Sequence, residues 1–203
     1  MIVALIIGAI RAERKRKEEL QAVAQRLGLS YVGKDHGALV PLRSATKLFE
    51  RGAARKYNNI MHGRIEDLSV YIFDYSYTLQ SGEETQRYMQ TVAAIFAEHS
   101  RAPKFELRPE HAFHRVASFF GYDDIDVADH PEFSRKVHLK GEDASAVLPA
   151  FSHETAERLT KAGKVCIESS GQWIVIYRPG KRLKPHEIEA FLSEAFELTT
   201  LFV

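Results

Sequence analysis

The sequence predicts an α+β protein in which an antiparallel sheet, built from hairpins, is covered by helices and preceded by an N-terminal, anchor-like helical segment. Two pairs of strand-like segments are each joined by a short turn that contains glycine, which is typical of hairpins. Segments with helical spacing of apolar residues separate these pairs. No regular alternation of strand and helix, which a parallel sheet would require, runs along the chain.

The chain begins with an uninterrupted apolar run, residues 1–10, followed by residues 11–17, which hold five Lys or Arg and one Glu. Ten helical residues rise about 15 Å, whereas a span of the hydrocarbon core takes about 20 residues. Three interpretations stay open: the stub of a transmembrane anchor whose start is missing or misassigned, an interfacial anchor, and a buried strand or helix. The cationic block favours the first, with the globular part facing the cytoplasm from the inner membrane, in single-pass or peripheral form.

Helical spacing continues beyond the basic block, through Leu20, Val23, Ala24 and Leu27, and Gly28 stands where a helix usually ends. We therefore expect the basic block to continue into an amphipathic helix. No Pro, Gly or Ser-rich stretch divides the rest of the chain. The predicted organisation is an N-terminal segment over residues 1–29 and a single α+β domain over residues 30–203.

The first hairpin is predicted from strands over residues 70–79 and 86–96, joined by a turn at residues 81–84. Alternation in the first strand places its aromatic residues on one face, which we expect to be core, and places Asp74 on a face that becomes polar. A strand over residues 104–108 follows and is expected to end at Pro109, with Glu110 beside it, where a helix begins. The apolar stripe of that helix is Phe113, Val116, Ala117 and Phe120.

The C-terminal half predicts a short strand at residues 137–139 and then a helix that is capped by Ser152 and closed by Gly163. A second hairpin pairs residues 165–168 with residues 173–178. The last helix is expected to begin near Pro185 and to bury Ile188, Phe191, Leu192, Ala195 and Leu198.

Composition and motif searches exclude several classes of function. The 28 basic and 27 acidic side chains give a net charge of +1, so no general field attracts nucleic acid. Cys166 is the only cysteine, which excludes an internal disulfide and a cysteine-cluster metal site, and its apolar strand predicts an inert thiol. The sequence lacks a nucleophile elbow, a phosphate-binding glycine loop and a zinc-protease motif. We therefore expect no catalytic residues, no cofactor and no metal.

Two partial metal patterns also fail. Asp124 and Asp126 imitate the start of a calcium loop, but the later ligand positions do not match. His111 and His114 could share a helix face, but a third zinc ligand is missing.

Eight ordered motifs resemble a family of uncharacterised bacterial single-pass, membrane-anchored proteins over most of the chain. The family carries no assigned activity, so the resemblance implies membrane anchoring but no substrate or catalytic residues. The full N-terminal hydrophobic segment of its members is shortened here to ten residues. The motifs are NIMHG (59–63), FDYSYT (73–78), QTV (90–92), FELRPE (105–110), FGYDDID (120–126), HPEFS (130–134), LKGED (139–143) and YR (177–178).

Two functional hypotheses follow. The leading one is a membrane-tethered cytoplasmic interaction or scaffolding module, with a protein partner at the membrane and no enzymatic activity. The alternative is a small-ligand-binding protein or enzyme that uses a polar strand face and an acidic loop. Its candidate ligand-binding residues are Asp74, Arg108, Glu110, Asp124 and Asp126. We expect Asp74 and Arg108 to pair with each other, because buried charges need partners.

Overall fold

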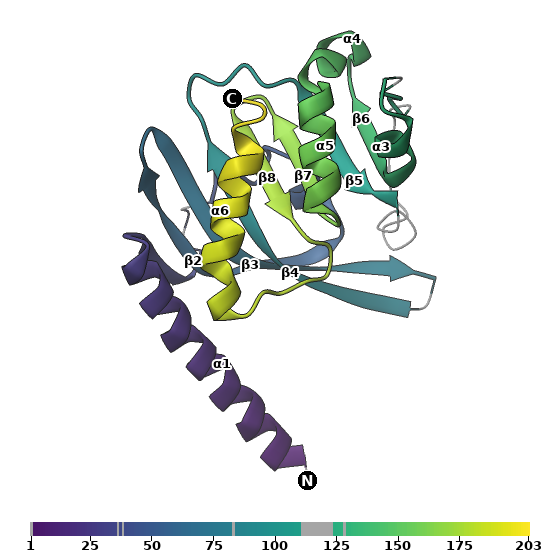
Figure 1. The fold of residues 1–203 in the computed structure, drawn as a ribbon. Helices are drawn as coiled ribbons and strands as arrows, with labels where there is room; N and C mark the ends of the chain where they lie inside the picture. The colour runs from purple at the N-terminus through teal and green to yellow at the C-terminus, as the bar shows by residue number, and fades with distance from the viewer. Residues whose placement is uncertain (1, 36, 38, 83, 111–123, 128) are drawn as a thin grey trace.

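A computed structural model describes residues 2–35, 37, 39–82, 84–110, 124–127 and 129–203. It confirms the α+β class, since one antiparallel sheet is combined with helices (Figure 1). The sheet has eight strands in the order β1-β2-β3-β4-β8-β7-β5-β6. The strands are β1 Ser30–Lys34, β2 Ala53–Ile65, β3 Leu68–Ser81, β4 Glu84–Phe96, β5 Lys104–Pro109, β6 Val137–Gly141, β7 Cys166–Ser170 and β8 Trp173–Tyr177.

The helices of the described chain lie mainly on one face of this sheet. The long helices α1 and α6 and the shorter α5 cover that face, as Figure 1 shows. Their bounds are α1 Ile2–Arg26, α3 Pro131–Lys136, α4 Ala144–Val147, α5 His153–Ala162 and α6 Ile188–Thr199, with 3-10 turns η1 Lys47–Glu50, η2 Leu148–Ala150 and η3 Pro185–Glu187.

Two apolar cores lie on opposite faces of the sheet. The larger one, on the helix-covered face, includes Ile72 of β3 and the buried residues of α1, α5 and α6. The smaller one gathers the aromatic residues of β3 under residues 39–49, which hold the buried Leu39, Leu42, Leu48 and Phe49. Alternation in β3 predicted this division, because neighbouring residues of a strand point to opposite faces.

Both predicted hairpins are confirmed. β3 pairs with β4 from Ser69 opposite Phe96 to Ser81 opposite Glu84, and β7 pairs with β8. The predicted start of α5 is confirmed as well, since the Ser152 hydroxyl accepts a hydrogen bond from the backbone N–H of Thr155. α6 buries the five residues expected of the last helix.

The predicted end of the strand over residues 104–108 at Pro109 is confirmed. Pro109 is the last residue of β5, opposite Val137 of β6, and the next residue, Glu110, is helical. Pairing with β7 stops at Leu107, so β5 has a ladder partner on one side only at this point, and a strand end tolerates proline there. The helix expected around Phe113 to Phe120 lies outside the described residues, as do His111 and His114.

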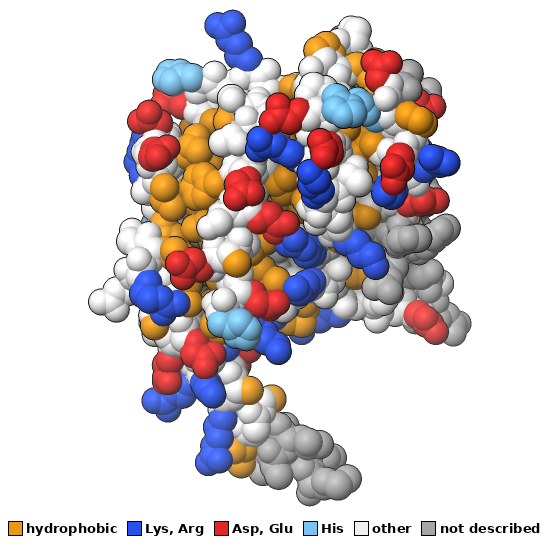
Figure 2. Space-filling view, viewed as in Figure 1, with side chains coloured by type: hydrophobic (Ala, Val, Ile, Leu, Met, Phe, Trp, Pro, Cys, Tyr) orange, Lys and Arg blue, Asp and Glu red, His pale blue; other side chains and the backbone are white. Residues whose placement is uncertain are grey.

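The basic block continues into a helix as expected, and α1 runs unbroken from Ile2 to Arg26. Its second half buries Leu20, Val23 and Ala24 in the larger core, whereas its first half extends clear of the sheet (Figure 1). Lys and Arg side chains lie beside apolar ones along this emerging part (Figure 2). Within the part of the chain that the structure describes, no helix is long and apolar enough to cross a membrane.

Candidate functional site

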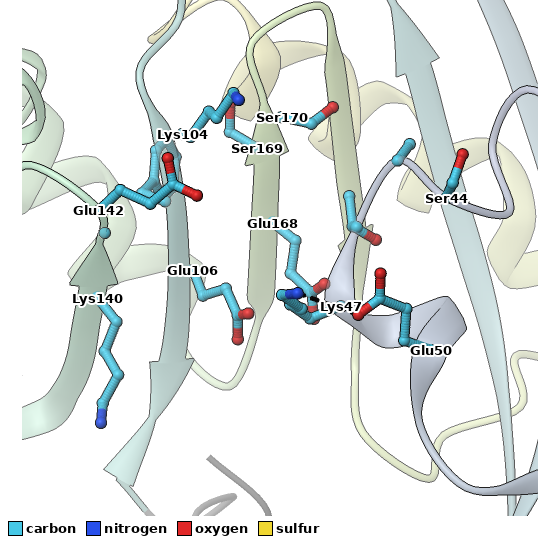
Figure 3. Close-up of a pocket in the computed structure, with 14 residues that line it drawn as sticks. Ser44, Lys47, Glu50, Lys104, Glu106, Lys140, Glu142, Glu168, Ser169 and Ser170 are labelled. Carbon is cyan, nitrogen blue, oxygen red and sulfur yellow. Dashed lines mark hydrogen bonds and ion pairs between the residues drawn. The ribbon is translucent and has the colours of Figure 1, made fainter. Parts of the chain in front are cut away.

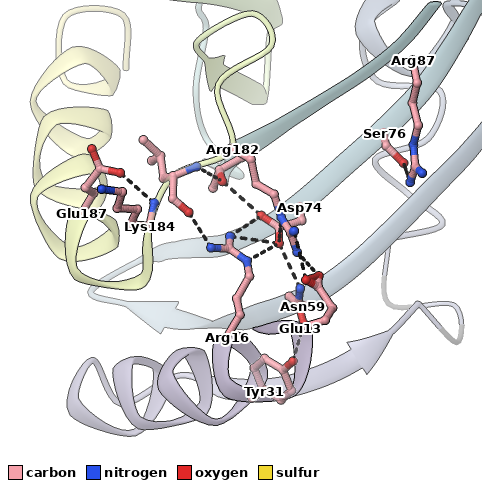
Figure 4. Close-up of polar contacts among 12 residues, drawn as sticks. Glu13, Arg16, Tyr31, Asn59, Asp74, Ser76, Arg87, Arg182, Lys184 and Glu187 are labelled. Atoms are coloured by element: carbon pink, nitrogen blue, oxygen red, sulfur yellow. Dashed lines mark hydrogen bonds and ion pairs between the residues drawn. The ribbon is translucent and has the colours of Figure 1, made fainter. Parts of the chain in front are cut away.

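The buried carboxylate of Asp74, on the helix-covered face of β3, fixes α1 to the sheet (Figure 4). Arg16 donates hydrogen bonds to this carboxylate from two nitrogens: Nη2 lies 2.9 Å from Oδ1 and Nε lies 3.1 Å from Oδ2. The third nitrogen, Nη1, donates to the backbone carbonyl of Leu183 at 2.7 Å. A bidentate guanidinium with a further backbone acceptor has a defined orientation, so this contact sets the direction in which α1 leaves the domain.

Three more side chains donate to the same carboxylate. Arg182 Nε lies 2.9 Å from Oδ2, Asn59 Nδ2 lies 2.9 Å from Oδ2, and Thr91 Oγ1 lies 3.1 Å from Oδ1. Arg182 also pairs with Glu13 of α1. The Asp74 cluster, defined as Asp74, Arg16, Arg182 and Glu13, therefore carries two positive and two negative charges. Both carboxylate oxygens of Asp74 accept hydrogen bonds. Asp74 therefore joins α1, the sheet and the segment before η3.

A second ionic group lies on the opposite face and is centred on Glu168 of β7, whose side chain is 1% exposed. Its Oε1 accepts from Tyr177 Oη at 2.7 Å and from Arg51 Nη2 at 2.9 Å, and its Oε2 accepts from the backbone N–H of Leu48 at 2.7 Å. Arg108 Nη2 lies 2.8 Å from Glu106 Oε2 and 3.4 Å from Glu168 Oε1. This Glu168 cluster joins the covering residues 46–51 to three neighbouring strands.

The Glu168 cluster forms one side of a cavity of about 330 Å³ between η1 and strands β5, β6 and β7 (Figure 3). Glu106 and Glu168 project from adjacent strands toward Lys47 and Glu50 of η1. Thr46 also lines the cavity, and its buried Oγ1 has no hydrogen-bond partner among the described residues. The cavity is thus a polar compartment with acidic, basic and hydroxyl groups.

Glu106 is the carboxyl group of this cluster whose pKa is raised to near neutral. Burial, followed by the negative charge of Glu168, raises the pKa of Glu106 to about 7. Arg51, with Nη2 at 3.4 Å from the Glu106 carboxylate, opposes that rise. A carboxyl group of this kind can accept or release a proton near neutral pH.

The expected pair between Asp74 and Arg108 does not form, because the two residues lie on opposite faces of the sheet. Asp74 shares its face with Ile72 and the larger core, whereas Arg108 alternates with Leu107, which belongs to that core, and so points to the other side. The reasoning that each buried charge needs a partner holds for both, but the partners are Arg16 and Arg182 for Asp74 and Glu106 and Glu168 for Arg108.

The remaining sequence candidates do not gather into one site. Glu110 is exposed at the end of β5, and Asp124 and Asp126 are exposed before α3. Asp124 Oδ2 lies 2.9 Å from His138 Nδ1. Among the residues that the structure describes, no three His, Cys, Asp or Glu side chains are grouped closely enough to hold a metal ion.

Sequence reasoning missed Glu106 and Glu168, although a signal for them was present. Each is a carboxylate in a predicted strand that directly follows a large apolar residue, as Asp74 follows Phe73: Glu106 follows Phe105 and Glu168 follows Ile167. Arg16 was missed for another reason. It lies among the cationic residues 11–17, which we interpreted together as a charge signal beside a membrane.

The fold and these two ionic clusters define an α+β protein whose long N-terminal helix is fixed by a buried salt bridge to an eight-stranded antiparallel sheet. No protein-family model matches the chain, and no curated protein matches it. It is similar in structure to the mycobacterial trehalose monomycolate transport factor A, TtfA, with a TM-score of 0.65 and 13% sequence identity, over 93% of this chain and 94% of that one. At this identity the likeness shows the fold alone.

Proposed function

We propose that this protein is a membrane-associated accessory module, held at the cytoplasmic face of the inner membrane by the first turns of α1, with its globular domain available to protein partners. The observation that carries the proposal is the emergence of α1 from the domain. Residues 2–10 carry no charged side chain and belong to the same helix that Arg16 fixes to Asp74, so an apolar segment extends in a set direction from a folded domain.

The exposed apolar side chains in the first half of α1 support the proposal that this part of the helix enters a membrane. Ile7 and Ile10 are 45% and 63% exposed. Burial of such a side chain is worth about 1.5–3 kcal/mol, which a bilayer would supply. Ten helical residues rise about 15 Å, enough to enter one leaflet. The exposed Arg11, Arg14 and Lys15 follow at the depth where cations meet anionic headgroups.

The similar structure supports the accessory part of the proposal. That protein is named a transport factor, and for this chain we propose the coarser role of an accessory factor that works beside other proteins. We also propose that the chain belongs to the family of uncharacterised bacterial membrane-anchored proteins whose motifs it resembles.

Flotation of the full chain with phosphatidylcholine–phosphatidylglycerol vesicles tests the membrane association. We expect the wild type to float and the double variant Ile7→Asp/Ile10→Asp to remain in the dense fraction. Val40→Asp/Leu148→Asp is the matched control, because those two apolar side chains are 56% and 38% exposed on other parts of the molecule. Equal flotation of both variants, or none by the wild type, would contradict the proposal.

A second candidate function, small-ligand binding, is favoured by the cavity beside the Glu168 cluster. Its size lies at the lower end of the range for small-molecule sites, and the unpartnered Thr46 hydroxyl offers a buried polar contact. A thermal-shift screen of small polar compounds tests it, since a ligand that binds only the folded state raises Tm. A hit whose shift survives unchanged in Thr46→Val would not occupy this cavity.

A further inference from the structure

A second cavity, of about 370 Å³, lies between the sheet and the part of α1 that contains Glu13 and Lys17. Lys17 contributes from α1, Lys56 from β2, Ser76 from β3 and Arg87 from β4. The cavity also borders the Asp74 cluster, through Asp74, Glu13 and Arg182. It is therefore built where the proposed membrane helix meets the globular domain.

The cationic groups of this cavity converge on one face of the sheet. Lys56 stands directly opposite Ser76 in the β2–β3 ladder, and Arg87 Nη2 lies 3.3 Å from Ser76 Oγ. Lys17 reaches over the edge strand, since its Nζ lies 4.0 Å from the position that a Cβ on Gly33 would take. Figure 4 shows Arg87 and Ser76 on the strands beyond Asp74.

The positive charge of this cavity is not balanced by its own carboxylates. The Asp74 cluster is neutral in itself, and both oxygens of Asp74 already accept from several donors. Lys17, Lys56 and Arg87 form no ion pair with any carboxylate in the described part of the chain. Three uncompensated cations around one cavity favour an anionic ligand, and phosphate oxygens suit both the planar guanidinium and the ammonium groups.

We infer that this cavity binds the phosphate of an anionic lipid headgroup, an inference that rests on the proposed membrane association. Lys17 follows Ile10 by seven residues, about 10 Å along the helix. The headgroup layer is about 5–8 Å thick on each side of the hydrocarbon core. If residues 1–10 occupy the core, the cavity meets the headgroup layer, and flexible Lys and Arg side chains close the remaining distance.

Native mass spectrometry of the full chain in detergent, with phosphatidylglycerol or phosphatidylcholine added, tests the site apart from membrane binding. We expect one phosphatidylglycerol per chain on the wild type, about tenfold less on Lys56→Gln/Arg87→Gln, and no phosphatidylcholine. Arg135→Gln/Lys136→Gln is the matched control, because it removes the same charge from exposed positions of α3 that do not line the cavity. It should retain the lipid.

Equal retention by both double variants, or equal retention of phosphatidylcholine, would overturn the site. Retention of inorganic phosphate without phosphatidylglycerol would assign the cavity to free phosphate and overturn the lipid. A wild type that retains phosphatidylglycerol but fails to float with vesicles would overturn the proposed function while leaving the site in place. Lys56 and Arg87 are exposed, so the test variants should fold, which urea denaturation verifies.

Discussion

Asp74→Asn tests the joint between α1 and the sheet. The substitution keeps the shape of the side chain but removes the charge that Arg16 and Arg182 share. An amide presents one oxygen in place of two and points its own N–H groups at the arginine donors. Arg16 keeps the Leu183 carbonyl and Arg182 keeps Glu13, but the two cations are left close together with one carboxylate.

The magnitude follows from burial. The side chains of Asp74 and Arg16 are 9% and 12% exposed, so their charges are poorly screened by water. Breaking a buried pair by removing one partner costs about 3–5 kcal/mol. Since Arg182 is 23% exposed and retains Glu13, we expect a loss near the lower limit, about 3 kcal/mol of the free energy of unfolding.

Urea denaturation, followed by the fluorescence of the single tryptophan, Trp173, measures this loss. Glu18→Gln is the control, because its pair with Arg14 is 61–82% exposed on the same helix and should contribute less than about 0.5 kcal/mol. A loss below about 1 kcal/mol for Asp74→Asn, or an equal loss for Glu18→Gln, would refute the assignment of the Asp74 cluster as the joint.

Three further outcomes concern the opposite face and one turn. Burial raises the pKa of Glu106 to about 7, so protonated Glu106 stabilises the fold fully below about pH 4.5, and this stabilisation is lost as the pH rises to about 7. Across that window the free energy of unfolding of the wild type should fall by about 3 kcal/mol relative to that of Glu106→Gln. Equal pH dependence of the two proteins in urea denaturation would contradict this. Cys166 is buried, with its pKa raised by burial, so native protein should resist iodoacetamide that labels it in urea; stoichiometric native labelling would be incompatible. Gly52 has φ +60°, and Gly52→Ala places a Cβ 2.2 Å from the Thr78 carbonyl oxygen. It should lower the free energy of unfolding in urea by more than Gly163→Ala, which has φ +73° and no described atom within 4 Å of the new Cβ and should lose about 1 kcal/mol. Equal losses for the two variants would argue against the clash.

The parts of the fold that sequence reasoning predicted are those whose signals are local. Alternating aromatic residues over 70–79 and a glycine turn were enough for the β3–β4 hairpin, because strand pairing across a short turn involves neighbours in sequence. Ser152 and Gly163 marked both ends of α5 for the same reason. Pro109 marked the end of β5 in the same local way, because a strand end with a ladder partner on one side only tolerates proline.

The parts that could not be predicted depend on partners far away in the sequence. Arg16 and Asp74 are 58 residues apart, and Arg51 and Glu168 are 117 residues apart, so no periodicity relates them. Residues 39–49 show no regular spacing of apolar residues, yet their few apolar side chains cover the second face of the sheet. Such irregular cover carries no repeating pattern, and its burial becomes visible only with the sheet in place.

The basic block of α1, residues 11–17, contains exposed cations and a mostly buried one, and the sequence alone does not distinguish them. Arg11, Arg14 and Lys15 are exposed, as a charge signal beside a membrane requires, whereas Arg16 turns inward and serves the fold. A variant that neutralises the whole block would therefore weaken the proposed membrane association and the attachment of α1 together. Only a substitution that spares Arg16 separates the two effects, because Arg16 contributes both to the direction of α1 and to the stability of the domain.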